Sequence, residues 1–222
     1  MSAQQLLDLF NQHYDFNSFI ASGNEITVAN LQSFTNQFTH IYGEHLTGKT
    51  HLLKSWVNLA SSRHQNAIYL DARELINEQL SGINLDELRF IAIDNIDTLN
   101  EDQQIELFDL FNHIKLNNRD NYLLTSSTIN LNNSKIRIDL KTRIYSGLVF
   151  GLKNLNESEL LSALTIYSNR EGIKIGEAEL KYLLHHYTRN LGKLIQLIIK
   201  ISNAALALKK TITIPLIKQN LE

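Results

Sequence analysis

Short apolar blocks alternate with longer segments of helical periodicity over residues 13–153. The blocks predict buried strands at residues 40–42, 67–70, 90–93, 122–124 and 148–152. The segments between them predict helices at residues 49–62, 72–78 and 102–116. Strands that alternate with helices are typical of a parallel sheet covered by helices. We therefore expect an α/β fold over residues 13–153.

The alternation stops after Lys153, and helical patterns then follow one another with no strand between them. Asn156 and Glu159 have the spacing of a capping box, in which the two side chains satisfy free amide groups at the start of a helix. Further helices are expected at residues 177–187, 190–208 and 214–221, the last with Thr213 as its cap and Pro215 in its first turn. The pattern predicts a small all-α domain over residues 154–222.

Composition and charge exclude several classes of protein. The chain of 222 residues is 43% hydrophobic and 20% charged, which is ordinary for a globular protein. Its 21 Lys and Arg against 23 Asp and Glu leave a net charge of −2, so no overall field steers it onto nucleic acid. With no cysteine, the chain has no disulfide, thiol nucleophile or cysteine-bound zinc, in keeping with a reducing compartment.

No targeting signal or membrane span is expected. The N-terminal segment lacks the basic region, apolar run and cleavage site of a signal peptide. The apolar stretch at residues 191–208 is interrupted by Lys193, Gln196, Lys200 and Asn203, which predicts an amphipathic helix. We therefore expect a cytoplasmic protein without a membrane partner.

Residues 43–50, with the sequence GEHLTGKT, match the phosphate-loop pattern G-x-x-x-x-G-K-[ST] between a predicted strand and a predicted helix. Gly43 and Gly48 let backbone N–H groups face phosphate oxygens at a helix N-terminus. Lys49 offers a cation to the β- and γ-phosphates, and Thr50 offers a hydroxyl to Mg²⁺. The alternative is a chance turn before a basic helix start, which the flanking strand and helix disfavour.

Asp94 ends the apolar block at residues 90–93 and fits the acid that holds Mg²⁺ beside a phosphate loop. The alternative is an Asp that only caps the following loop. Asn95 stands where many nucleotide hydrolases have a second acid, and an amide cannot act as a base, so slow hydrolysis of the chain's own nucleotide is expected. Leu46 occupies a position where glycine is usual, which favours weak or selective nucleotide binding.

These motifs, together with other segments, resemble the DnaA/Hda family of AAA+ proteins over nearly the whole chain. The other segments are DFNSF at 15–19, IDNID at 93–97, LLTSS at 123–127, KTR at 141–143 and ITIP at 212–215. The resemblance implies an AAA+ phosphate-loop sheet flanked by helices, a small all-α lid, and ADP or ATP with Mg²⁺ in the cleft between them. The chain has no counterpart of the initiator's helix-turn-helix domain, so specific DNA binding of its own is not expected.

The resemblance assigns roles to individual residues. Gly43, Gly48, Lys49, Thr50 and Asp94 would bind the nucleotide, with Thr50 and Asp94 serving its Mg²⁺. Polar residues at the end of a central strand would also bind the nucleotide, by sensing its γ-phosphate. These are Thr125 and Ser126, with Ser127 beside them.

Arg143 is similar in position to the family's arginine finger, which reaches into the nucleotide site of a neighbouring protein. The alternative is an exposed ion pair, for example with Asp139 one helical turn earlier. Gly192 stands where the family has an arginine in the lid, with Arg189 and Lys193 as nearby cations of different geometry. Such an arginine finger would also allow copies of this chain to associate with one another in a nucleotide-dependent way.

Residues 4–10, QQLLDLF, resemble the Q-x-x-L-x-L-F peptides that bind the sliding clamp, so residues 1–12 are interpreted as a recruitment tail. In such peptides Gln4 would donate at the pocket edge, and Leu7, Leu9 and Phe10 would fill its apolar floor. The alternative is an amphipathic first helix that packs on the chain's own core.

The resemblance implies a negative regulator of replication initiation. It would bridge the DNA-loaded clamp and the initiator DnaA, and stimulate hydrolysis of DnaA-bound ATP through Arg143 in trans, with weak or no ATPase activity of its own. The main alternative is an autonomous AAA+ ATPase that acts as a helicase loader or remodeller. A DNA-binding, initiator-like protein is disfavoured by the charge balance.

Overall fold

The computed structural model describes residues 14–75, 80–116 and 120–221. The chain divides into two compact units, the first ending at Asn154 and the second beginning at Leu155. The tail predicted at residues 1–12 lies outside the described residues.

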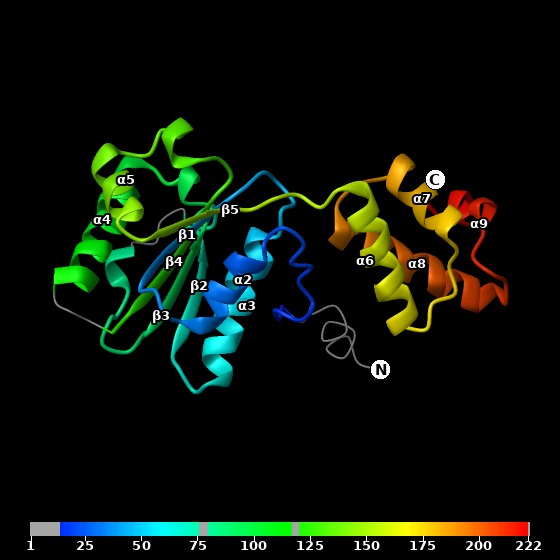
Figure 1. The fold of residues 1–222 in the computed structure, drawn as a ribbon, viewed down its shortest axis with the longest axis horizontal. Coiled ribbons are helices and arrows are strands. Elements are labelled where there is room, and N and C mark those ends of the chain that lie inside the picture. The colour runs from blue at the N-terminus through cyan, green and yellow to red at the C-terminus, as the bar shows by residue number, and fades with distance from the viewer. Residues whose placement is uncertain (1–13, 76–79, 117–119, 222) are drawn as a thin grey trace. The chain divides into compact units, whose positions relative to one another are not determined.

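The first unit is built on a five-stranded parallel sheet with the strand order β2-β3-β4-β1-β5 (Figure 1). The strands are β1 Phe38–Tyr42, β2 Ala67–Asp71, β3 Phe90–Asp94, β4 Tyr122–Ser127 and β5 Leu148–Gly151. Because all the strands run in one direction, their carboxyl ends meet at one edge of the sheet. In this register His40 of β1 lies beside Thr125 of β4, and Asp71 of β2 lies beside Asp94 of β3.

Helices cover both faces of this sheet (Figure 1). Helices α2 (Glu25–Ser33) and α3 (Lys49–Ser62) share one core with Phe90 and Ala92 of β3. Helices α4 (Glu101–Leu116) and α5 (Ile138–Tyr145) share the other with Ile91 and Ile93. Successive side chains of a strand point to opposite faces. An uninterrupted apolar strand such as β3 therefore has to be covered on both.

The second unit contains α6 (Glu157–Arg170), α7 (Glu177–His186), α8 (Leu191–Leu208) and α9 (Ile214–Leu221). Leu164, Leu183, Leu194, Ile198 and Ile217 are buried in its core. The expected parallel sheet flanked by helices, followed by a small all-α domain, is confirmed.

Most predicted elements are found, and the helices predicted at residues 49–62 and 214–221 have the bounds of α3 and α9. The predicted capping box is also present: the N–H of Glu159 donates to Asn156 Oδ1 (3.0 Å), and the N–H of Asn156 donates to Glu159 Oε2 (2.7 Å).

The helix predicted at residues 72–78 is wrong over its described part, where residues 72–74 form a turn. The N–H of Ala72 donates to Asp94 O (3.0 Å) and so extends the sheet pairing. The N–H of Arg73 donates to the Asp71 carboxylate (3.1 Å), a local side-chain bond that competes with helix formation. Helices α2 and α5 were not predicted.

Helix α8 has 18 residues and a mean hydropathy of 1.5, and by length and composition alone it could cross a membrane. Its apolar side is used within the second unit, because Leu194, Ile198, Ile201 and Ala205 are buried in that core. This burial accounts for the amphipathic pattern in the sequence.

Candidate nucleotide site and arginine finger

The predicted phosphate loop connects β1 to α3. Gly48 precedes α3 with φ 89°, and a Cβ atom there would lie 2.6 Å from a ring carbon of Phe19. A Cβ on Gly43 would lie 2.9 Å from Thr47 Oγ1 and 3.1 Å from Leu152 O. Both positions therefore require glycine. Leu46 adopts φ 76° with its side chain 62% exposed, so the loop takes a left-handed conformation there without glycine.

Lys49 is buried inside this loop. Its Nζ atom donates to Gly43 O (2.6 Å) and Glu44 O (2.8 Å). Burial lowers the pKa of Lys49, although the negative charges of Asp94 and Asp97 oppose that shift. The ammonium group is therefore held at the start of α3, where a phosphate would meet the loop.

Asp94 ends β3 and is completely buried among hydrogen-bond donors. Oδ2 accepts from Thr50 Oγ1 (2.5 Å) and from the Tyr69 hydroxyl (3.0 Å). Oδ1 accepts from Ser126 Oγ and from the N–H of Asn95. Burial and the charge of Asp94 raise the pKa of Tyr69, so its hydroxyl remains a donor. The structure thus brings Thr50, Asp94 and Ser126 together.

This arrangement fits a nucleotide phosphate with Mg²⁺. Helix α3 begins after Gly48, which has no side chain to cap it, so its first N–H groups can bind an anion. Lys49 adds a positive charge, and the hydroxyl of Thr50 and the carboxylate of Asp94 are oxygen ligands that Mg²⁺ prefers. Thr50 and Asp94 are therefore the residues that would serve the metal.

The polar residues at the end of β4 divide between two partners. Ser126 contacts Asp94, whereas Thr125 Oγ1 lies 2.8 Å from Nδ1 of His40 and Ser127 Oγ lies 3.1 Å from its Nε2. Burial lowers the pKa of His40 to about 3, so its ring is neutral at pH 7. The sequence analysis missed His40, which is brought to Thr125 by the pairing of β1 with β4.

Tyr69 and Asp71 of β2, and Arg73 just after that strand, were also missed. Asp71 accepts from Asn95 Nδ2 (3.0 Å) and from Arg73 Nη2 (2.5 Å). Burial alone would raise the pKa of Asp71, but the hydrogen bonds from Arg73 and Asn95 outweigh it and lower the pKa. One signal was available, because Asp71 ends an apolar block just as Asp94 does.

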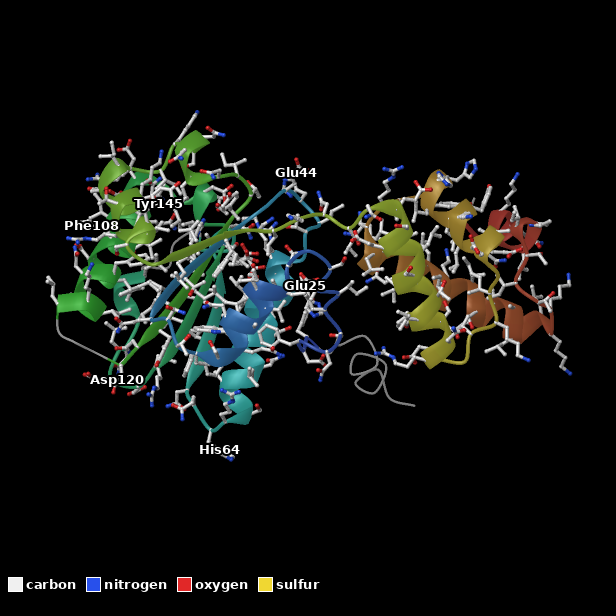
Figure 2. All side chains as sticks on the ribbon, in the orientation of Figure 1. Glu25, Glu44, His64, Phe108, Asp120 and Tyr145 are labelled. Carbon is white, nitrogen blue, oxygen red and sulfur yellow. The ribbon has the colours of Figure 1, made fainter. Side chains whose placement is uncertain are left out.

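Arg143 lies in the last turn of α5, with its guanidinium carbon 5.4 Å from the ring centre of Phe108. Figure 2 labels Phe108 on α4 and Tyr145 at the end of α5. Asp139 forms its ion pair with Arg137 instead (2.8 Å). The alternative ion pair between Arg143 and Asp139 is therefore wrong, because Arg137 occupies the carboxylate.

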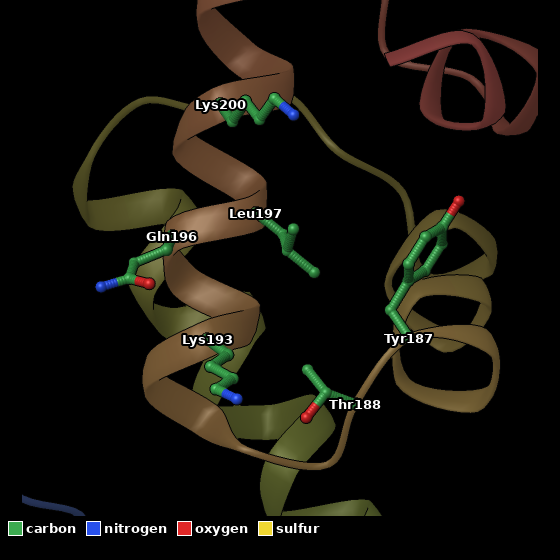
Figure 3. A pocket seen from close by; sticks show the side chains of 6 residues that line it. All are labelled: Tyr187, Thr188, Lys193, Gln196, Leu197 and Lys200. Atoms are coloured by element: carbon green, nitrogen blue, oxygen red, sulfur yellow. The ribbon is translucent and has the colours of Figure 1, made fainter. Parts of the chain in front are cut away.

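The lid cations near Gly192 have different surroundings within the second unit. Arg189 Nη2 lies 3.3 Å from Glu157 Oε2 in an exposed ion pair. Lys193 lines an open pocket of about 510 Å³ on this unit. Figure 3 shows its lining side chains, which are Tyr187, Thr188, Lys193, Gln196, Leu197 and Lys200.

The predicted clamp-binding residues Gln4, Leu7, Leu9 and Phe10 lie outside the described residues. Tyr14, where the described part begins, packs against α3. Asn58 Nδ2 donates to Tyr14 O (2.8 Å), and Lys54 Nζ lies 4.8 Å from the Tyr14 ring centre.

Comparisons with known proteins agree with this geometry. Residues 10–151 match the family model of the bacterial DnaA ATPase domain, and residues 157–221 match the Hda lid domain. An uncharacterized protein of Haemophilus influenzae is 24% identical over 194 residues, covering 86% of this chain and 84% of its own.

Solved structures share the fold at low identity. Domain III of the Thermotoga maritima replication initiation protein DnaA has a TM-score of 0.79 and 21% identity, covering 95% of this chain and 96% of its own. AMPPCP-bound DnaA from Aquifex aeolicus has a TM-score of 0.72 and 22% identity, with 90% and 69% covered. The Thermotoga maritima RuvB Holliday junction branch migration motor has a TM-score of 0.70 and 16% identity, with 94% and 71% covered.

The family match extends over more than half of the chain and includes the phosphate loop, Asp94 and Arg143. The chain therefore belongs to the bacterial DnaA ATPase-domain family of AAA+ proteins and carries a lid domain of the Hda type.

Proposed function

We propose that this protein is a negative regulator of replication initiation. It joins the DNA-loaded sliding clamp to the initiator DnaA and presents Arg143 to ATP bound on DnaA. DnaA then hydrolyses that ATP and loses its active form. The reaction is ATP hydrolysis on a partner, with a catalytic group supplied in trans.

The observation that best supports this proposal concerns Arg143. Its side chain lies over Phe108, and among the described residues it forms no ion pair. A guanidinium group that is not neutralised by a carboxylate can stabilise the charge that develops on a transferred phosphoryl group, an effect worth roughly 10³ to 10⁵ in rate.

The chain's own site has the features needed to hold ADP or ATP with Mg²⁺ through Lys49, Thr50 and Asp94. When bound, Mg²⁺ would neutralise phosphate charge there. Asn95 lies next to Asp94 and cannot accept a proton from water as a carboxylate does. These features support a nucleotide that is retained at this site while hydrolysis takes place on the partner.

Recruitment to the clamp is assigned to Gln4, Leu7, Leu9 and Phe10. Apolar anchors of this kind can dominate the binding energy of a short peptide. Tyr14, which follows the proposed tail in the sequence, is anchored on α3 of the first unit.

Reciprocal variants test the two halves of the proposal. Arg143→Ala should abolish stimulation of DnaA-bound ATP hydrolysis and leave binding to the clamp unchanged. Leu9→Ala combined with Phe10→Ala should abolish clamp binding, and hydrolysis in assays that depend on the loaded clamp should fall with it. Clamp binding that is unaffected by the double substitution would contradict the recruitment role.

The complete phosphate-loop arrangement also favours a second candidate, an autonomous AAA+ ATPase that loads a helicase or remodels a complex. Steady ATP turnover by the isolated protein that disappears in Lys49→Ala would support this alternative. Bound nucleotide without turnover would support the regulator.

A further inference from the structure

The side chain of Asn95 is held by an ion pair from the neighbouring strand. Its Nδ2 atom donates to Asp71 Oδ1 (3.0 Å). Arg73 donates to the same carboxylate through Nε (3.0 Å to Oδ1) and Nη2 (2.5 Å to Oδ2). Asp71 and Asn95 are each only 7% exposed, so the amide and the carboxylate meet largely out of water.

Strand register brings this ion pair to the nucleotide site. Asp71 lies directly beside Asp94 in the pairing of β2 with β3, and adjacent residues of parallel strands share a face. Asn95 follows Asp94 and has φ 59°, a left-handed conformation that Asn tolerates better than most residues. Its N–H donates to Asp94 Oδ1 (3.1 Å) and Ser126 Oγ (3.1 Å). Both the backbone and the side chain of Asn95 are therefore held in place.

The chemistry of this contact discriminates between an amide and an acid. An amide offers Asp71 two N–H donors, whereas an ionised carboxylate offers only acceptors. An acid at position 95 would face the largely buried Asp71 carboxylate at hydrogen-bond distance. The two carboxylates would repel each other, and the nearby guanidinium of Arg73 already bonds to both oxygens of Asp71.

We propose that Asp71, fixed by Arg73, is a specificity-determining residue that requires an amide at position 95 and so prevents the chain from hydrolysing nucleotide bound at its own loop. This inference rests on the proposed nucleotide site of Lys49, Thr50 and Asp94. Asp71 and Arg73 are positioning residues here, acting through Asn95.

Exchanging the acid at position 71 with the amide at position 95 should remove this block on hydrolysis. In D71N/N95D, the amide at position 71 can donate to the carboxylate at position 95, with the polarity of the hydrogen bond reversed. That carboxylate can accept the proton of a water whose oxygen bonds to the γ-phosphorus. The bond from phosphorus to the β–γ bridging oxygen breaks with its electron pair passing to ADP, and inorganic phosphate is formed.

The experiment compares four full-length proteins: the wild type, N95D, D71N/N95D and the control D120N, which removes an exposed acid before β4 (Figure 2). For each protein, ATP binding, single-turnover hydrolysis of the bound ATP and the thermal unfolding midpoint are measured. We expect N95D to unfold at a lower temperature and to hydrolyse ATP no more than twofold faster than the wild type. D71N/N95D should regain the unfolding midpoint and hydrolyse at least tenfold faster, while D120N matches the wild type.

Two results would overturn the inference: an N95D protein as stable and as active as D71N/N95D, or a D71N/N95D protein that binds ATP and hydrolyses it no faster than the wild type. A wild-type protein that binds no ATP would overturn it together with the proposed nucleotide site. Stimulation of DnaA through Arg143 is measured separately on the partner's ATP, so its failure is distinguishable from all three results.

Discussion

The Asp94 carboxylate shows how single residues build the site. Its two oxygens accept hydrogen bonds from Thr50 on α3, Tyr69 on β2 and Ser126 on β4, and from the N–H of Asn95. A buried carboxylate needs such donors because water no longer solvates it. The same contacts join the start of α3 to three strands, so a change at any of these side chains affects both the loop and the residues proposed to hold Mg²⁺.

His40 leads to a prediction about pH. Its pKa falls from 6.5 in the unfolded chain to about 3 in the folded protein because it is buried. Below pH 6.5 the unfolded state therefore binds a proton that the folded state does not, and stability is lost as the pH falls towards 3. At pH 4.5 the expected loss from this residue is about 2 to 3 kcal/mol.

The measurement is the free energy of unfolding between pH 7.5 and about pH 4.5 for the wild type and His40→Gln, which keeps polar atoms near Thr125 and Ser127. The variant should be less stable at pH 7.5 but should lose less stability on acidification. Identical pH profiles would show that His40 is not buried in its neutral form.

At this scale, sequence reasoning identifies residues that belong to one local motif. Lys49, Thr50 and Asp94 follow from the loop pattern and from an acid that ends an apolar strand. His40 and Tyr69 could not be found in this way, because their partners depend on which strands pair and in what register. Asp71 ends an apolar strand as Asp94 does, but its contact with Asn95 depends on the same pairing. The Arg143–Asp139 ion pair was wrong for a related reason, since helical spacing does not show that Arg137 competes for the same acid.

At the scale of elements, helices α3 and α5 carry the two groups to which the proposal assigns a function. Helix α3 starts at the phosphate loop, and Trp56 on its inner face packs against Phe90 of β3 (ring centres 5.1 Å apart). Helix α5 carries Arg143 in its last turn and is held by buried Leu140 and Ile144. Each group is therefore positioned by a helix that is anchored on the sheet.

The two helices that prediction missed are short and bury few side chains. Helix α5 has eight residues with only Leu140 and Ile144 buried, and its Ile138 is 84% exposed. Helix α2 has only Thr27 and Leu31 buried. A single pair of buried positions is too short a pattern to distinguish a helix from a loop unless start signals accompany it, as Thr213 and Pro215 do for α9. The long helices α4 and α8 repeat the pattern several times and were found.

The capping box of α6 gives a prediction at this scale. Asn156→Ala removes the Oδ1 acceptor of the Glu159 N–H and should lower the free energy of unfolding of the second unit by about 1 kcal/mol. Asn203→Ala is the matched control, because Asn203 is exposed inside α8 and alanine favours helices. Chemical denaturation followed by circular dichroism measures both. A loss in Asn203→Ala equal to that in Asn156→Ala would contradict the capping role.

For the whole molecule, each unit has its own hydrophobic core, and each matches its own family model. At this scale the fold class was predicted correctly. The alternation of strands and helices continues to Lys153, and only helical patterns follow it. The proposed division of labour places nucleotide binding and the catalytic arginine in the first unit, with recruitment in the segment before Tyr14.

The central claim is that Arg143 acts on ATP held by another protein. The most direct test is single-turnover hydrolysis of ATP preloaded on DnaA, with the DNA-loaded clamp and one of three proteins: the wild type, Arg143→Ala or Arg137→Ala. Arg137 precedes the same helix and is bound to Asp139, which makes it a matched control. We expect the wild type and Arg137→Ala to accelerate hydrolysis equally and Arg143→Ala to leave it at the rate of DnaA alone. Full stimulation by Arg143→Ala would contradict the proposed mechanism.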